Sequence, residues 1–317
     1  MDTRGLETHP SQRNLEALLR PPHLPRMTSQ IFFQLLISGL SVGSIYALVA
    51  VALVIPFKAS SILNFAQGEI VAVGAYAGLV LTQSGMPYWM VFLGSMCMGL
   101  VFGLAIERLI IRRIMAAAEF TLVIATFAVG LIIQSAIRLY WQDNLFTIDN
   151  PMPVNSIKTL GLVLNVQYLW IIFCTTVLIA VLAWFFKFNR MGKAMRAVSM
   201  HHSAARLMGI HVERVLMLSW GMAGAIGAMS GILLAPIIGI NPGIGHLILK
   251  ALVAAVIGGF TSLPGACVGG LLLGLVETYS GAFFGSTLKN ILPFMLLVAF
   301  LLIKPYGLFG KAPLVRV

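Results

Sequence analysis

Amide and carboxylate side chains interrupt the apolar sequence at the run from Asn64 to Glu69. Asn64 and Gln67 have the three-residue spacing of a capping box, in which each side chain satisfies a backbone group at a helix start. Glu69 then falls in the first turns of that helix, where the helix dipole favours a carboxylate. The run predicts either a helix start near the membrane interface or a buried acid that faces the interior of a bundle.

A second polar interruption lies in the short apolar stretch 243–258, which carries Lys250 in its middle. Asn241 and Pro242 precede it, as an N-cap followed by proline at the first helical position. A helix of about 16 residues is roughly 24 Å long, shorter than the ~30 Å hydrocarbon core. It indicates either a broken helix beside a polar cavity or a tilted span with a snorkelling lysine. Glu277, in the next stretch, is a candidate partner for Lys250, since pairing relieves both charges.

The composition requires these groups to be positioned by helices in lipid. The 317 residues are 59% hydrophobic and 10% charged, against about 25% charged in a soluble domain. We therefore expect an all-α integral membrane protein, a polytopic bundle of eight or nine transmembrane helices, some of them short or broken. The expected spans lie at about 31–56, 63–82, 88–108, 119–140, 167–187, 214–235, 243–258, 264–283 and 288–303.

Basic residues cluster at the ends of these spans and predict the orientation. The segment 188–213 is rich in Lys and Arg, whereas 141–166 holds Asp143, Asp149 and a single Lys. The positive-inside rule places the first in the cytoplasm and the second outside. The residues that then fall inside are Lys58, Arg108, Arg112, Arg113 and the C-terminal Lys304, Lys311 and Arg316. The net charge of +11 is thus explained without a nucleic-acid-binding module.

Residues 1–26 differ from the rest, because they are polar, proline-rich and basic. Nine crossings place the N-terminus outside, which disagrees with that basic segment. We expect either a start of translation at Met27 or a disordered tail. Residues 27–317 then form a single integral membrane unit.

The basic segment between two spans predicts a short cytoplasmic helix. Ser199 can cap a helix that runs through Met208 and ends at Gly209 in the left-handed region. Ala204, Ala205 and Met208 fall largely on one face. Such a helix either inserts into the groove of a partner protein or rests on lipid headgroups.

The sequence predicts no catalytic site and no metal site. It contains no P-loop, no serine-protease arrangement and no zinc-protease motif. Neither His201 nor His202 has a nearby Cys or carboxylate to complete a ligand set. The three cysteines are dispersed in apolar runs. The small residues Ala223, Gly227 and Gly231, and likewise Ala266, Gly270 and Gly274, form stripes that predict close helix packing.

Several segments resemble the branched-chain amino-acid ABC permease family, specifically its LivH-type membrane subunit, over residues 27–310. The matching segments are Gly43–Leu48, Asn64–Glu69, Arg190–Gly192, Leu207–Ile210, Asn241–Pro242, Lys250–Gly259, Leu263–Ala266, Gly269–Gly270 and Glu277. Gln67 departs from the pattern, since the family commonly has His there. That departure puts in doubt a titratable role at Gln67 and, mildly, the identity of the substrate.

The resemblance implies a permease subunit in the cytoplasmic membrane of a bacterium. Its implied partners are a second related permease, two ATP-binding subunits that hydrolyse ATP, and an extracytoplasmic substrate-binding protein. The chain itself would be no enzyme and would hold no cofactor. The residues expected to couple to the ATPase are Arg196, Ser199, Ala204, Ala205, Arg206 and Gly209, and those expected to line or brace the pathway are Asn64, Gln67, Glu69, Lys250 and Glu277.

Three other functions remain open from the sequence. An ABC permease for urea or short amides would have the same architecture. A secondary transporter would need more ion-coupling carboxylates in the spans than Glu69 and Glu277, and it would not need a coupling helix. A channel would work without ATPase partners.

Overall fold

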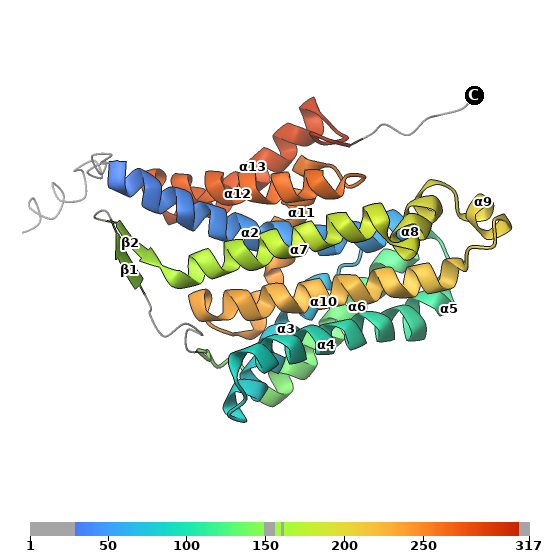
Figure 1. Ribbon diagram of the computed structural model, residues 1–317, viewed down its shortest axis with the longest axis horizontal. Coiled ribbons are helices and arrows are strands. Elements are labelled where there is room, and N and C mark those ends of the chain that lie inside the picture. The colour runs from blue at the N-terminus through green and yellow to red at the C-terminus, as the bar shows by residue number, and fades with distance from the viewer. Residues whose placement is uncertain (1–28, 149–155, 160–161, 311–317) are drawn as a thin grey trace, which may run out of the picture.

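The computed structural model describes residues 29–148, 156–159 and 162–310, which form an elongated bundle of helices (Figure 1). Within these residues, seven helices are long and apolar enough to cross a membrane. The expected polytopic α-helical bundle is confirmed. These helices are α2 (Ser29–Ser60), α4 (Tyr88–Ile106) continued by η1 (Glu107–Ile111) and α5 (Arg112–Ile114), α6 (Glu119–Trp141), α7 (Val166–Phe188), α10 (Val212–Ile238), α12 (Leu263–Phe284) and α13 (Ser286–Ile303).

Two further segments are shorter, as expected for interrupted helices. Helix α3 (Gln67–Gln83) follows six non-helical residues after the end of α2. The other segment begins as a 3-10 helix, η2 (Pro242–His246), and continues as α11 (Leu247–Gly258). Asn241 caps it as predicted, since its Oδ1 accepts a hydrogen bond of 2.8 Å from the Gly243 amide.

The two ends of the bundle differ in charge and structure. One end, here called the basic end, carries α8 (Arg190–Met200), α9 (His202–Leu207) and α5 (right in Figure 1). The guanidinium of Arg112 there donates to the Glu213 carbonyl at the start of α10. The opposite end carries the antiparallel strands β1 (Ser156–Thr159) and β2 (Leu162–Asn165). The acidic and basic connecting segments therefore lie at opposite ends, as their charges require.

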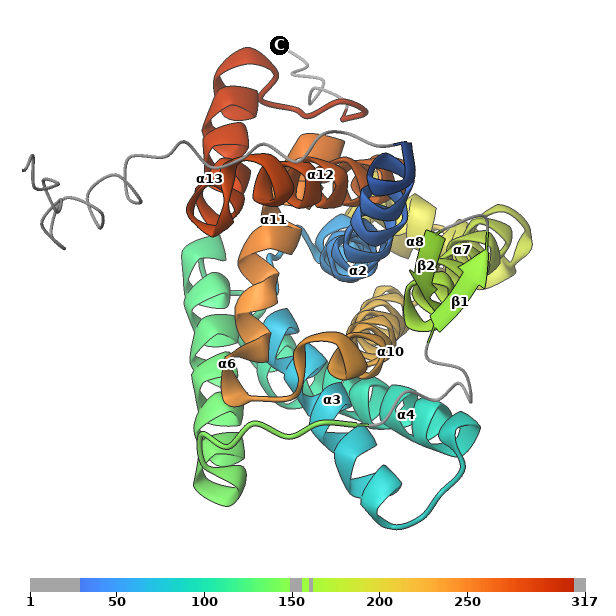
Figure 2. The ribbon, with the colours of Figure 1, turned by 90° about the vertical axis from the view of Figure 1, so that its left-hand side faces the viewer.

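Helix α2 occupies the centre of the bundle, between α12, α7 and α10 (Figure 2). Its residues from Gly43 to Pro56 are all buried, and a helix that is apolar on every side must be enclosed by others. Helices α6 and α13 lie at the periphery and expose large apolar side chains, Ile132 and Leu302 among them. Exposed apolar faces of this kind suit contact with lipid.

The predicted stripes of small residues lie where helices approach closely. A Cβ atom on Gly274 would collide with the backbone of Gly43, and one on Gly270 would collide with the backbone of Ala47. Both contacts join α12 to α2. In the other stripe, Gly231 faces the Val71 carbonyl of α3. Small residues allow this approach where lipid supplies no hydrophobic drive for association.

Candidate functional site

The segment before α3 is held by buried amide groups. Asn64 Oδ1 accepts from the Ala66 amide at 3.1 Å, and Asn64 Nδ2 donates to Gln67 Oε1 at 3.2 Å. Gln67 Nε2 donates to the Ala223 carbonyl of α10 at 2.9 Å. The predicted capping box is wrong, because α3 begins only at Gln67 and has no side-chain cap. Asn64 instead shapes the non-helical turn that leads into the helix.

This segment lies deep within the bundle. Ala223 is the twelfth of the 27 residues of α10, which places its carbonyl about 16 Å along a helix of about 40 Å. Thr126 of α6 contributes from the other side, where its hydroxyl accepts from the Phe65 amide at 3.1 Å. Nothing in the sequence singled out Thr126 except that it is polar within an apolar run. Backbone groups that a broken helix leaves unpaired are thus satisfied by side chains of neighbouring helices.

Glu69 is a buried acid in the first turn of α3. It is 9% exposed, and its Oε2 atom has no hydrogen-bond partner among the described residues. Its carboxylate fills space left by Gly245 of η2, where a Cβ atom would collide with it, and its Cγ lies beside Gly130 of α6. Of the two interpretations that the sequence left open, the structure supports a buried acid. The two interrupted helices therefore meet at this carboxylate.

Lys250 and Glu277 form the second polar group. Lys250 Nζ lies 2.6 Å from Glu277 Oε1, and the Tyr46 hydroxyl donates to Glu277 Oε2 at 2.7 Å. The group joins α11, α12 and α2. The expected pairing of the lysine with the acid is present, so Lys250 does not snorkel. Sequence reasoning did not single out Tyr46, whose polar tip in an otherwise aliphatic part of α2 was the available signal.

The five residues expected in the pathway therefore fall into two groups. Asn64, Gln67 and Glu69 lie together at the start of α3. Lys250 and Glu277 lie where α11 packs against α12. No hydrogen bond links the two groups within the described part of the chain. Four of the five side chains are engaged in bonds that brace helices. Glu69 is the exception, since it retains an unused acceptor.

At the basic end, the predicted single helix from Ser199 to Met208 is wrong. Ser199 lies inside α8, where its hydroxyl donates to the Arg196 carbonyl at 2.8 Å. The extended residue that separates α8 from α9 is His201, with φ of −158°. A serine whose hydroxyl is bonded within its own helix is not available as a cap. The expected left-handed end at Gly209 is present, with φ of +78°.

These two helices expose apolar side chains among basic ones. Met200, Leu207 and Met208 are 82%, 88% and 83% exposed. Ala205 packs inward, while Ala204 is exposed, so the apolar face does not follow the predicted one. Arg196 and Arg206 are exposed beside it. Three large apolar side chains outside the bundle, rimmed by arginine, form a surface suited to a protein partner.

Comparison with known families now identifies the architecture. A family model described as branched-chain amino acid transport system, permease component, matches residues 35–301. The chain belongs to this family. The resemblance noted in the sequence is thereby confirmed.

The relatives of this permease include bacterial and archaeal proteins. The permease protein BraD of Pseudomonas aeruginosa, from a high-affinity branched-chain amino acid transport system, is 31% identical over 90% of this chain and 98% of its own length. LivH of Escherichia coli is 30% identical, with the same coverage. A probable LivH of Methanocaldococcus jannaschii is 30% identical over 84% of this chain and 89% of its own length. These permeases are membrane subunits of transport systems, which fits the multi-pass bundle described here.

Proposed function

We propose that this chain is the membrane-spanning permease subunit of an ATP-driven importer for branched-chain or related amino acids. Family membership and the names of BraD and LivH support the substrate class. The observation that carries the proposal is the meeting of α3 and η2 at the unused carboxylate oxygen of Glu69. Interrupted helices that meet at mid-membrane are a recurrent way to build a solute site in a transporter.

The proposed pathway runs past Glu69 and not through the other polar residues. Asn64 and Gln67 brace the start of α3, and Lys250 with Glu277 braces α11, because their polar atoms are already bonded. A carboxylate with a free acceptor can contact the ammonium group that every amino acid carries. The basic end then faces the cytoplasm and the strands β1 and β2 face outward, in the cytoplasmic membrane of a bacterium.

The energy source in this proposal is ATP hydrolysis by partner subunits that dock on α8 and α9. A route for the motion exists in the fold. Helix α9 leads through Gly209 into α10, and the Ala223 carbonyl of α10 binds the Gln67 side chain at the start of α3. A displacement of α9 along α10 would therefore shift the helix start that carries Glu69. A second related permease subunit and an extracytoplasmic binding protein complete the proposed complex.

The experiment that tests the function is reconstitution of the whole complex in proteoliposomes. Uptake and ATP hydrolysis are measured with leucine, isoleucine, valine, urea and short amides, each with the cognate binding protein. Uptake of branched-chain amino acids that requires ATP supports the proposal. Uptake at full rate without the ATP-binding subunits supports a channel or a secondary transporter, and uptake of urea or amides alone overturns the substrate class.

Replacing Glu69 with Gln should lower the rate of amino-acid uptake about tenfold, equivalent to about 1.4 kcal/mol. The fold should tolerate the change, because no described residue bonds to Glu69 Oε2. Gln67→Leu gives the contrasting result: it removes the bond from α3 to the Ala223 carbonyl of α10 and leaves the buried Asn64 amide without its acceptor, so it should lower the thermal stability. Uptake assays and melting curves of both variants separate the two roles. Unchanged uptake by Glu69→Gln removes Glu69 from the pathway.

Introducing Ser at both Leu207 and Met208 should weaken binding of the ATP-binding subunits about tenfold, since exposed apolar anchors carry much of an interface's affinity. The melting temperature should not fall, because both side chains are more than 80% exposed. Arg206→Glu should also weaken docking, and Arg113→Glu at the same end is its matched control. Co-purification and binding titrations with the ATP-binding subunits measure the effect. Docking that survives both changes excludes α9 as the contact.

A further inference from the structure

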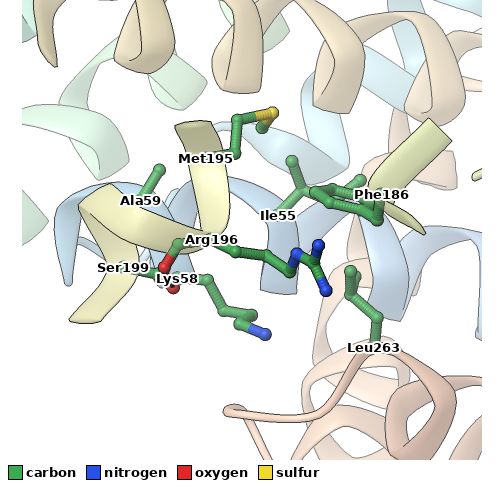
Figure 3. Close-up of a pocket in the computed structure, with 8 residues that line it drawn as sticks. All are labelled: Ile55, Lys58, Ala59, Phe186, Met195, Arg196, Ser199 and Leu263. Carbon is green, nitrogen blue, oxygen red and sulfur yellow. Dashed lines mark hydrogen bonds between the residues drawn. The ribbon is translucent and has the colours of Figure 1, made fainter. Parts of the chain in front are cut away.

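A cleft at the basic end is lined by cationic and hydroxyl side chains. It measures about 540 Å³ and lies between the last turn of α2, the end of α8 and the turn that joins α11 to α12. Its lining residues are Phe57, Lys58, Ser61, Arg196, Ser199, Met200 and Thr261. Figure 3 shows a small adjoining pocket, which Lys58, Arg196 and Ser199 also line.

The two cations in this cleft have no acidic partner among the residues that the structure describes. Neither Lys58 nor Arg196 forms an ion pair with another described residue, and the cleft's lining includes no Asp or Glu. Two like charges that share a cleft repel each other, so an anion between them would relieve the repulsion and gain two charge-assisted contacts. Ser61 in the same cleft supplies one further hydroxyl donor. This is the donor set that a phosphate group requires.

Apolar space continues directly from the cationic cleft. A second cleft of about 410 Å³ shares Phe57 and Thr261 with the first. Its other lining residues are Val256, Phe260, Leu301, Pro305 and Tyr306. The pocket in Figure 3 places Ile55, Phe186 and Leu263 beside the two cations, but at about 10 Å³ it has no room for a chain. The occupant that fits a cationic cleft continued by an apolar one is itself amphipathic.

We propose that these clefts bind one anionic phospholipid of the cytoplasmic leaflet. The phosphate lies between Lys58 and Arg196, and an acyl chain follows the apolar cleft toward Leu301 of α13. Basic pockets between membrane helices on the cytoplasmic side suit anionic headgroups. A free phosphate ion would satisfy the cations but would leave the apolar cleft unused.

Such a lipid would link the coupling region to the core. Lys58 belongs to the central helix α2, whereas Arg196 and Ser199 belong to α8, which precedes the surface proposed to dock the ATP-binding subunits. A phosphate that contacts both would fix α8 against α2. The lipid requirement is a property of this chain's own residues, so it can be tested whatever solute the complex transports.

The test is retention of lipid by the full chain, measured by native mass spectrometry after purification from membranes and after exchange into nanodiscs. The nanodiscs contain zwitterionic lipid with or without phosphatidylglycerol. Wild type should retain one phosphatidylglycerol, and Lys58→Gln or Arg196→Gln should each lower its affinity about fivefold. Lys58→Arg should restore binding. Arg113→Gln, which removes an exposed charge from the same end outside the cleft, should leave it unchanged.

Two further arms identify the ligand. Inorganic phosphate and glycerol phosphate are added in place of lipid, and the melting temperature is followed. Phosphatidylglycerol should raise the melting temperature of wild type but not of the double variant Lys58→Gln/Arg196→Gln. An equal rise with inorganic phosphate would overturn the lipid assignment. Equal lipid retention by wild type and the double variant would overturn the site itself.

Discussion

Replacing Glu277 with Leu should destabilise the folded permease by about 3 kcal/mol. The substitution leaves the Lys250 ammonium without its partner at 2.6 Å and removes the acceptor of the buried Tyr46 hydroxyl. Removing one member of a buried ion pair typically costs about 3–5 kcal/mol. The lower end applies here, because the Lys250 side chain is 23% exposed. Chemical unfolding of the purified chain in mixed micelles measures the difference.

Two matched variants distinguish this ion pair from a general effect of lost charge. Glu119→Leu removes an exposed acid from the start of α6 and should change the stability by less than about 0.5 kcal/mol. The double variant Lys250→Met/Glu277→Leu should recover part of the stability, since it leaves no buried charge but still leaves the Tyr46 hydroxyl without its acceptor. If Glu277→Leu costs no more than Glu119→Leu, the pair does not hold α11 and α12 together. Transport by the double variant then shows whether the charges themselves are needed.

The helical bundle could be predicted from the sequence because each membrane helix is determined by the composition of its own segment. Every stretch of about 20 apolar residues must become a helix in lipid, where backbone groups find no water. The partnership of Lys250 with Glu277 was also predictable, because an unpaired charge in a span is costly. The small-residue stripe at Gly270 and Gly274 indicated close packing in the same way. Its partner helix, α2, could not be read from spacing alone.

The details of the candidate site depend on contacts between distant segments. Asn64 has the sequence position of a helix cap, but its side chain bonds to Ala66 and Gln67 in the turn before α3. Thr126 of α6 and Ala223 of α10 supply the other hydrogen-bond partners of this turn. Spacing within one segment cannot reveal partners that lie more than 60 residues away. The break at His201 escaped prediction for a similar reason. Serine is a common N-cap residue, but the Ser199 hydroxyl donates to the Arg196 carbonyl inside α8.

The close packing of α12 against α2 should tolerate no added methyl group. Gly274→Ala places a Cβ atom against the backbone of Gly43, which no side-chain rotation can relieve. Alanine gains up to about 1 kcal/mol over glycine in a helix, whereas overpacking costs about 1–3 kcal/mol. The overlap is with backbone, so the cost should lie at the upper end and leave a net loss of about 2 kcal/mol. Thermal and chemical unfolding of the purified chain measure this loss.

Gly130→Ala is the matched control, because it makes the same chemical change on another membrane helix. Its Cβ atom would have no neighbour nearer than 3.5 Å, the Cα of Ala66, so helix propensity should dominate and stability should stay level or rise. A loss of stability for Gly274→Ala beside no loss for Gly130→Ala would show that the close backbone contact between α2 and α12 causes the effect. Replacement of a helical glycine by itself would not explain it. A second-site Gly43→Ala should not rescue Gly274→Ala, since it adds volume to the same contact. If Gly274→Ala matches wild type, α12 must be able to move away from α2 at little cost, and the close contact is not what fixes the core.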